Sequence, residues 1–273
     1  MSSHPLDPPA APARPNRPAL DLEARLLHRD GLLLILDKPA GVPVHRGPKG
    51  DRPGEINLEQ FFDQLMFGLP RAPSLAHRLD KDTSGCLVLG RHRKALEKLG
   101  LLFKQGKVDK TYWAVVEGEP AGDAGEIDLA LGRLDESRGW WMKADPAGLP
   151  SRTLWRVLGR GADQATGAPI AWLALEPITG RTHQLRVHCQ AMGWPILGDP
   201  IYGSAPRAGG PPLHLHSREI VVPMSKNKEP VRAVAPAPPH MRERLRACGW
   251  EGVEMPSASA PLPAPGEGVE GRR

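Results

Sequence analysis

The sequence contains few cysteines, and they are not spaced as a disulfide framework would require. Cys86, Cys189 and Cys248 are an odd number and form no CxxC pair, so paired disulfides are not expected. The first two stand in apolar periodic segments, which is typical of small core residues. These observations favour a reducing compartment, and we expect a cytoplasmic protein.

Long hydrophobic runs and targeting signals are also missing. No stretch approaches the ~20 apolar residues of a membrane span, so no membrane association is expected. The start of the chain has no secretory hydrophobic region, and six prolines in its first twenty residues disfavour a transit helix. Residues 1–19 and 255–273, rich in Pro with Ala or Gly, are predicted to be disordered. Residues 20–254 would then form one folded domain.

Metal ligands at a workable spacing are absent as well. His183 and His188 are five residues apart, so on a helix they point about 140° away from each other. His214 and His216 share one face of a predicted strand, but no thiol or carboxylate with ligand spacing accompanies them. We therefore expect no metal site.

Positive charge is present, and it is concentrated. The net charge is +5, and the segment from His77 to Thr111 holds nine Lys or Arg against four Asp or Glu. A basic band of this kind predicts a polyanionic partner. A solvated, lysine-rich helix face accounts for the same charge equally well. The basic band alone therefore does not distinguish a polyanion-binding surface from an ordinary solvent-exposed one.

Hydrophobic periodicity predicts a chain of both strands and helices. Apolar runs and alternation predict strands at 32–36, 86–89, 110–117, 153–158 and 171–175, with a further piece at 140–142. Helical spacing predicts helices at 58–67, 93–105 and 183–192, the last capped by Thr182 and ended by Gly193. The segment 118–167 suits an antiparallel meander.

The loop at 77–85, HRLDKDTSG, leads into the apolar strand predicted at 86–89. It offers an imidazole, a guanidinium and two carboxylates, and loops held against strands often carry reactive groups. Asp80 follows Leu79, which should pack inward, so its carboxylate need not be freely solvated. The alternative is a polar turn in which Asp82, Thr83 and Ser84 only cap backbone groups.

Three separated blocks resemble the RluA-type RNA pseudouridine synthases. They are residues 77–80 with 83–85, residues 110–112 and residues 179–188, and supporting matches lie at 37–41 and 195–203. The resemblance implies an α+β pseudouridine synthase fold, with a mainly antiparallel central sheet, flanking helices and a basic active-site cleft. Many relatives carry a small RNA-binding domain ahead of the catalytic core. The proline-rich leader is expected not to supply one, so RNA selection would rest with the catalytic domain, residues 20–254.

The same resemblance implies roles for individual residues. Asp80 matches the essential aspartate, Tyr112 the tyrosine that faces the target base, and Arg186 the basic residue that pairs with the aspartate. Leu185 matches the apolar residue beside that basic residue, and Arg78 the side chain that fills the gap left by an extracted nucleotide. We assign further RNA contacts to three residues in the matching blocks: Arg181, His77 and Lys38.

The implied reaction joins the uracil of uridine to ribose through carbon-5 instead of nitrogen. A carboxylate at the anomeric centre could act as the nucleophile or take a proton from the sugar's 2-position, and the sequence leaves both open. Nothing is added or removed, so no cofactor is expected. Arg186 would keep Asp80 ionised, because a close opposite charge lowers a carboxylate pKa.

Two other classes of function were weighed. A non-catalytic RNA-binding protein on the same scaffold would not need Asp80, Tyr112 and Arg186 together. The other class is a hydrolase, either a glycosidase that uses Asp80 and Asp82 or a histidine-based ribonuclease. A glycosidase would need two carboxylates about 5–9 Å apart flanking its substrate, and two carboxylates two positions apart in one loop are not expected to do so. We predict an isomerase that converts specific uridines in structured ribosomal or transfer RNA, as a monomer without an obligate protein partner.

Overall fold

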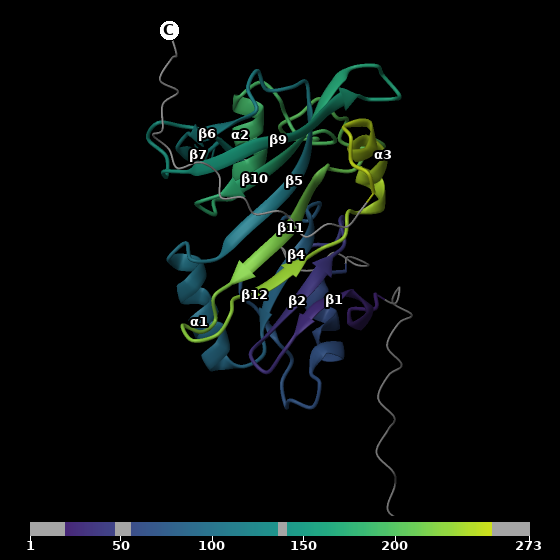
Figure 1. The fold of residues 1–273 in the computed structure, drawn as a ribbon. Helices are drawn as coiled ribbons and strands as arrows, with labels where there is room; N and C mark the ends of the chain where they lie inside the picture. The colour runs from purple at the N-terminus through teal and green to yellow at the C-terminus, as the bar shows by residue number, and fades with distance from the viewer. Residues whose placement is uncertain (1–19, 47–55, 136–140, 253–273) are drawn as a thin grey trace, which may run out of the picture.

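The computed structural model describes residues 20–46, 56–135 and 141–252 (Figure 1). The predicted disordered segments 1–19 and 255–273 lie outside the described residues, as does Trp140 of the strand piece predicted at 140–142. Within the described ranges, no helix is both long enough and apolar enough to cross a membrane.

One mixed sheet of ten strands forms the centre of the molecule, and a separate two-stranded ribbon lies beside it (Figure 1). The main order is β1-β2-β4-β11-β5-β10-β9-β6, with β12 paired to β11 and β3 to β4. Among the described strands of this sheet, the pairings are antiparallel apart from β4 with β11. The predicted α+β class with a mainly antiparallel sheet is therefore confirmed. The strands are β1 (Leu26–Arg29), β2 (Leu33–Lys38), β3 (Ser74–Leu75), β4 (Ser84–Gly90), β5 (Asp109–Glu117), β6 (Ala124–Asp128), β7 (Leu131–Arg133), β8 (Met142–Ala144), β9 (Arg152–Ala162), β10 (Pro169–Pro177), β11 (Leu215–Val222) and β12 (Val231–Val234).

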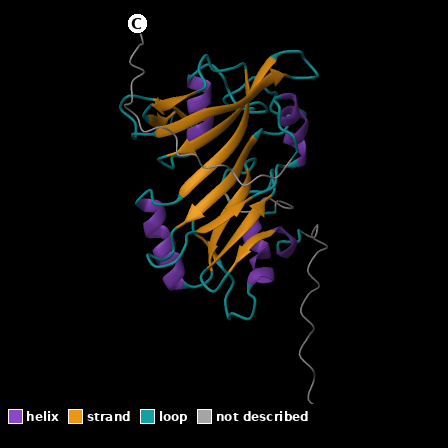
Figure 2. Cartoon of the chain, viewed as in Figure 1, coloured by secondary structure: helices purple, strands orange, loops and turns teal. Residues whose placement is uncertain are grey.

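Helices cover both faces of this sheet (Figure 2). The short 3-10 helix η2 and the helix α2 pack in one apolar cluster on the first face. Helices α1 and α3 pack in two further clusters on the opposite face. The helices are η1 (Glu23–Arg25), η2 (Leu58–Leu65), α1 (Arg93–Lys104), α2 (Gln184–Ala191) and α3 (Pro239–Ala247).

Two helix predictions need correction. The segment predicted as a helix at 58–67 is the 3-10 helix η2, which ends at Leu65. The helix predicted from His183 starts at Gln184, and the residue at its N-cap is His183, not Thr182. His183 has φ +53°, a left-handed conformation, and its side chain caps no helix amide. The prediction that Thr182 caps this helix is wrong, because the chain turns into the helix one residue later.

Strand β5 places Tyr112 on the face that carries α2. Tyr112 and Ala114 belong to the cluster that also contains Leu185, whereas Trp113 and Val115 pack on the opposite face with α3. This split is the one that the alternation at 110–117 predicts. It brings Tyr112 and the first turn of α2 to the same side of the sheet.

Strand β11 fixes the predicted reactive loop against β5. Ser217 of β11 is the register partner of Gly85 on one side and of Tyr112 on the other. Gly85 has φ +102°, and a Cβ there would lie 2.2 Å from the carbonyl oxygen of Ser217. Only glycine fits this close approach. The loop that ends at Gly85 is thus held at a fixed distance from Tyr112.

Candidate active site

Asp80 lies in a short turn at the wall of a cavity. Leu79 is buried in the apolar cluster below the turn, and the amide of Thr83 donates to the carbonyl oxygen of Asp80 at 3.2 Å. The Asp80 side chain keeps 28% of its surface exposed. The turn that carries Asp80 is therefore anchored on both sides, and its carboxylate is still open to a substrate.

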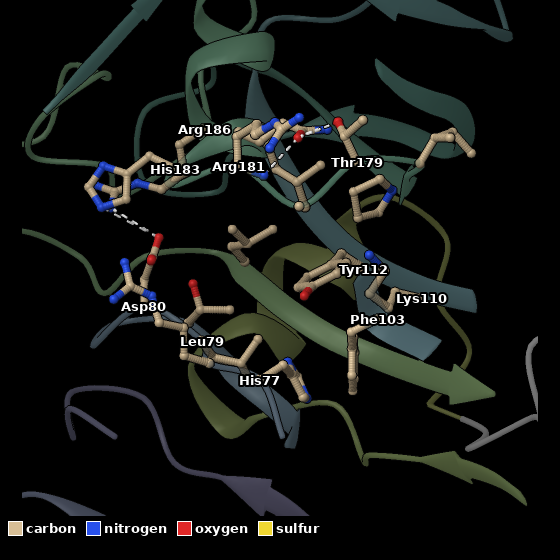
Figure 3. Close-up of a pocket in the computed structure, with 18 of the residues that line it drawn as sticks. His77, Leu79, Asp80, Phe103, Lys110, Tyr112, Thr179, Arg181, His183 and Arg186 are labelled. Carbon is tan, nitrogen blue, oxygen red and sulfur yellow. Dashed lines mark hydrogen bonds and ion pairs between the residues drawn. The ribbon is translucent and has the colours of Figure 1, made fainter. Parts of the chain in front are cut away.

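The cavity has a volume of about 550 Å³ and is formed by three parts of the chain together with Leu215 of β11 (Figure 3). The loop before β4 forms one wall, β5 with the end of α1 forms another, and the segment from β10 into α2 closes the third. These are the three blocks that the sequence singles out, so the fold brings them together. Residues along its wall include His77, Arg78, Asp80, Lys110, Tyr112, Arg181, Leu185 and Arg186.

Arg186 stands between two carboxylates. Its Nη1 lies 3.6 Å from Asp80 Oδ2, within ion-pair distance. Its Nε and Nη2 donate at 2.7 and 2.8 Å to the two oxygens of Asp199, which is fully buried. Arg186 is therefore hydrogen-bonded to Asp199, and its Nη1 also donates to His183 Nε2 at 3.3 Å, while Asp80 shares the same guanidinium at longer range.

Asp199 is a residue to which the sequence argument gave no role. It lies in the supporting block at 195–203, and this block is the signal that could have singled it out. Burial opposes its charged form, but hydrogen bonds from Arg186 and from the amides of Ile201 and Tyr202 prevail, and they lower the pKa of Asp199. Asp199 is thus an anion that fixes Arg186 in place.

His183 also faces Asp80, as Figure 3 shows. Its Nε2 lies 3.6 Å from Asp80 Oδ2, and its Nδ1 lies 2.9 Å from the hydroxyl of Tyr202. Burial lowers the pKa of His183 to about 4, so the ring is neutral at pH 7. From the sequence, His183 was a candidate only for metal binding, which its spacing from His188 disfavoured. Across the described ranges, no group of three or more His, Cys, Asp or Glu could hold a metal ion.

Tyr112 and Leu185 form the apolar wall of the cavity. Both side chains are nearly buried, at 9% and 6% exposure, and both belong to the cluster under the site. Burial raises the pKa of the Tyr112 hydroxyl well above its ordinary value. The phenol therefore stays protonated throughout the physiological range.

Arg78 and Arg181 lie exposed at the cavity wall, as expected of residues that contact RNA. Arg78 also lines a neighbouring cavity of about 310 Å³ on the other side of Asp80. His77 lines the larger cavity, but its Nε2 accepts the amide of Val88 at 3.0 Å and its ring stacks on Phe103. Its predicted RNA contact stays a prediction.

Lys38 does not fit the RNA-binding role predicted for it. Its side chain is buried at 1% exposure, and its Nζ donates to the carbonyl oxygens of Pro39 and Lys81 at 2.8 and 2.9 Å. Burial lowers the pKa of Lys38 to about 7. The side chain ties the end of β2 to the Asp80 turn from behind, where RNA has no access to it.

Comparison with known proteins agrees with this site. The sequence model described as RNA pseudouridylate synthase matches residues 32–191. An uncharacterized RNA pseudouridine synthase of Zymomonas mobilis is 42% identical over 221 residues, which cover 80% of this chain and 95% of the relative. Ribosomal large subunit pseudouridine synthase C of Vibrio cholerae is 34% identical over 246 residues, covering 87% of this chain and 73% of the relative.

A solved structure has the same fold. Human RNA pseudouridylate synthase domain containing 4 superposes with a TM-score of 0.65 at 28% identity, over 82% of this chain and 94% of the human chain. The chain belongs to the RNA pseudouridylate synthase family. Within that family it is of the RluA type, and it is an isomerase that converts uridine to pseudouridine in RNA.

Proposed function

We propose that this isomerase acts on a specific uridine of a structured ribosomal or transfer RNA, and that Asp80 acts on the ribose of the flipped nucleotide. The observation that carries the proposal is the position of the Asp80 carboxylate. It stands at the cavity wall with two buried nitrogens, Arg186 Nη1 and His183 Nε2, each 3.6 Å from its Oδ2. A nearby guanidinium favours the ionised carboxylate, which is the form that attacks or accepts a proton.

A carboxylate in this position can act in two ways. One oxygen attacks C1′ of the ribose as the bond to N1 breaks, or it accepts the proton from C2′. In the first route the freed uracil turns within the cavity, and the bond from Asp80 to C1′ breaks as C5 attacks C1′. In the second route the uracil turns likewise, C5 joins C1′, and Asp80 returns the proton to C2′. C5 loses its proton and N1 gains one, so uridine and pseudouridine have the same composition.

Tyr112 and Leu185 give the uracil an apolar surface on which to turn. Because the Tyr112 phenol stays protonated, it offers the base a flat ring and a neutral hydroxyl. A second ionised group there would compete with Asp80 for Arg186, whereas a phenol does not. This arrangement favours a role of Tyr112 in holding the base, while the acid–base work is left to Asp80.

The target nucleotide must leave its helix to reach Asp80. Extruding a base costs a few kcal/mol, because stacking and pairing are lost. Arg78 is exposed and lies two residues from Asp80, between the two cavities. Its guanidinium can stack on a base and reach a phosphate, which lysine does less well. We infer that Arg78 offsets part of the extrusion cost.

The RNA would lie across a basic rim. Lys104, Arg78 and Arg181 are exposed along the cavity, and Lys110 lies at its wall. Contacts from such side chains to phosphates make binding weaken with salt. The Vibrio cholerae relative is named for the ribosomal large subunit, so large-subunit RNA is the first substrate to test and transfer RNA the second.

Asp80→Asn tests the proposal, with Asp82→Asn as a matched control in the same turn. The first change should abolish conversion of uridine while RNA affinity and melting temperature stay near the wild-type values. The second removes a carboxylate that borders only the smaller cavity, and it should keep activity within a few-fold. Pseudouridine is mapped in full-length RNA, and free uracil is measured alongside. Measurable turnover by purified Asp80→Asn would refute the role of Asp80.

A further inference from the structure

The cavity extends well beyond Asp80. Figure 3 shows Asp80 at one end, Tyr112 in the middle, and Phe103 and Lys110 on the other side of Tyr112. Its volume of about 550 Å³ is that of a cavity for a drug-sized ligand, which spans ~300–1,000 Å³. The ribose lies at Asp80 and the uracil on Tyr112 in the proposed function, so the target nucleotide fills the end at Asp80. The opposite end, here called the far end, is lined by Phe103, Lys104, Gly106, Lys110, Pro177 and Ile178.

Strand β5 places Lys110 beside Tyr112 in this cavity. The two residues are two positions apart, so their side chains leave the same face of the sheet, ~6–7 Å apart along the strand. Both line the cavity, and Lys110 lies on the side of Tyr112 that faces away from Asp80 (Figure 3). An RNA strand that leaves the uracil site in this direction therefore meets Lys110 next.

The Lys110 ammonium is a half-buried positive charge that the protein itself does not pair. Among the residues that the structure describes, none forms an ion pair or a hydrogen bond with this ammonium. Burial lowers the pKa of Lys110, and the attraction of Asp109 opposes this only in part. The exposed Lys104 adds a second positive charge at the same end. A phosphate between the two lysines would stabilise the charged form of Lys110, since an ionised partner makes the stronger hydrogen bond.

The far end also has an apolar surface. Ile178 is 47% exposed, although it directly follows β10, and it lies at the wall with Pro177. The half-buried Phe103 stacks on His77 with ring centroids 4.6 Å apart. A Cβ at Gly106 would lie 3.8 Å from the carbonyl oxygen of Ile178, so the end of α1 and the end of β10 meet here. Apolar side chains beside two lysines suit a nucleotide, which has a flat base and a charged phosphate.

We propose that the far end is a second nucleotide subsite, which holds the nucleotide next to the target uridine in the RNA chain. Its phosphate meets Lys110 and Lys104, and its base packs against Ile178 and Phe103. The described residues that line the far end include no Asn, Gln, Asp or Glu, so this subsite takes the face of any base and does not select one base over another. The inference rests on the proposed function, because it needs the target nucleotide at Asp80.

Binding of short nucleotides to the full-length enzyme tests the proposal. The probes are uridine 5′-monophosphate and the dinucleotides pUpU, pUpA and pUpC, titrated into enzyme labelled at its isoleucine methyl groups. The dinucleotide pUpU should bind at least ~5-fold more tightly than the mononucleotide, as expected for one additional stacked base. The dinucleotides pUpA and pUpC should bind within a few-fold of pUpU. The Ile178 methyl signal should shift with the dinucleotides and much less with the mononucleotide. Ile201, which lines the smaller cavity, reports on the opposite direction and should not move further.

Two variants separate the phosphate from the base. Lys110→Gln removes the half-buried charge, and Ile178→Ser removes the exposed apolar side chain. In each variant, the ratio of the mononucleotide Kd to the pUpU Kd should fall toward one. Lys94→Gln is the matched control, because it removes a lysine that is exposed on α1 and does not line the cavity. This control should keep the wild-type ratio. Melting temperatures show that the variants compared are folded.

The proposal is overturned if pUpU binds no more tightly than the mononucleotide, or if the Ile201 methyl signal shifts in place of that of Ile178. It is also overturned if the wild-type ratio survives in Ile178→Ser, since the far end would then hold a phosphate and no base. Binding is measured without turnover, so it is independent of the role of Asp80. An active Asp80→Asn enzyme removes the proposed function. An inactive Asp80→Asn enzyme, together with no gain from the second nucleotide in the wild type, removes only this inference.

Discussion

The positive charge beside Asp80 depends on the buried ion pair between Arg186 and Asp199. Arg186 is 4% exposed and Asp199 is fully buried, and two hydrogen bonds join them. Removing one partner of such a pair leaves an uncompensated charge, which costs about 3–5 kcal/mol. Asp199 therefore determines where the Arg186 guanidinium lies relative to Asp80.

Asp199→Asn is expected to lower both stability and turnover. The amide keeps the size of the carboxylate but not its charge, so Arg186 would lose its buried partner and shift toward Asp80. The melting temperature and kcat should both fall, and thermal unfolding with single-turnover assays would measure them. Glu97→Gln is the control, because it breaks an exposed i,i+4 pair with Arg93 that contributes little. An Asp199→Asn enzyme as stable and active as Glu97→Gln would contradict this account.

For the residues of the site, the sequence predicted which side chains lie together but not which hydrogen bonds and ion pairs join them. Asp80, Tyr112, Leu185 and Arg186 do meet at one cavity, because the motifs that mark them border it. The division of Arg186 between two carboxylates depends on atomic distances, which spacing along the chain does not contain. Lys38 was assigned to RNA because it is a basic residue in one of the blocks that match the family. Its burial follows from the pairing of β2 with β4, a contact between distant segments.

Between elements, the parallel pairing of β4 with β11 is the contact that sets the loop in place. Ser84 and His216 are 132 residues apart and bond each other at 2.9 Å. Local periodicity predicted β2, β4, β5, β9 and β10 within a few residues, since it reads the alternation within each strand, but it did not single out β1, β3 or β12. It does not show which strands pair, and it does not separate a 3-10 helix from an α-helix over eight residues such as η2.

Gly85→Ala should therefore damage the site through the sheet. The new Cβ would lie 2.2 Å from the Ser217 oxygen at a backbone φ of +102°, so β4 must move away from β11. We expect a lower melting temperature and a loss of turnover larger than the loss of folded protein explains. Gly100→Ala in α1 is the matched control, because nothing lies within 4 Å of its added Cβ. That change should raise stability by roughly 0.5–1 kcal/mol. If Gly85→Ala and Gly100→Ala had the same melting temperature and turnover, the close approach of β4 and β11 would not be needed for stability or activity.

For the whole molecule, buried histidines are the groups that tie stability to pH. Burial lowers the pKa of six histidines, to about 3 for His77 and His216, to about 4 for His183 and His214, and in the same direction for His188 and His240. In the unfolded chain their pKa returns to about 6.5. Between these values the unfolded state binds protons that the folded state does not, so stability falls as pH falls.

The free energy of unfolding should thus decrease as the pH is lowered from about 6.5 toward 4. Each of these histidines contributes up to about 1.4 kcal/mol per pH unit. Denaturant titrations at several pH values measure the slope, which gives the number of protons taken up on unfolding. His216→Gln removes one titrating ring that bonds Ser84 and the Ala235 carbonyl, and an amide can replace part of that bonding. The variant should be less stable at pH 7 but lose less stability on acidification, with an uptake smaller by about one proton. An unchanged uptake would mean that His216 is already protonated in the folded protein, against the burial that the structure gives it.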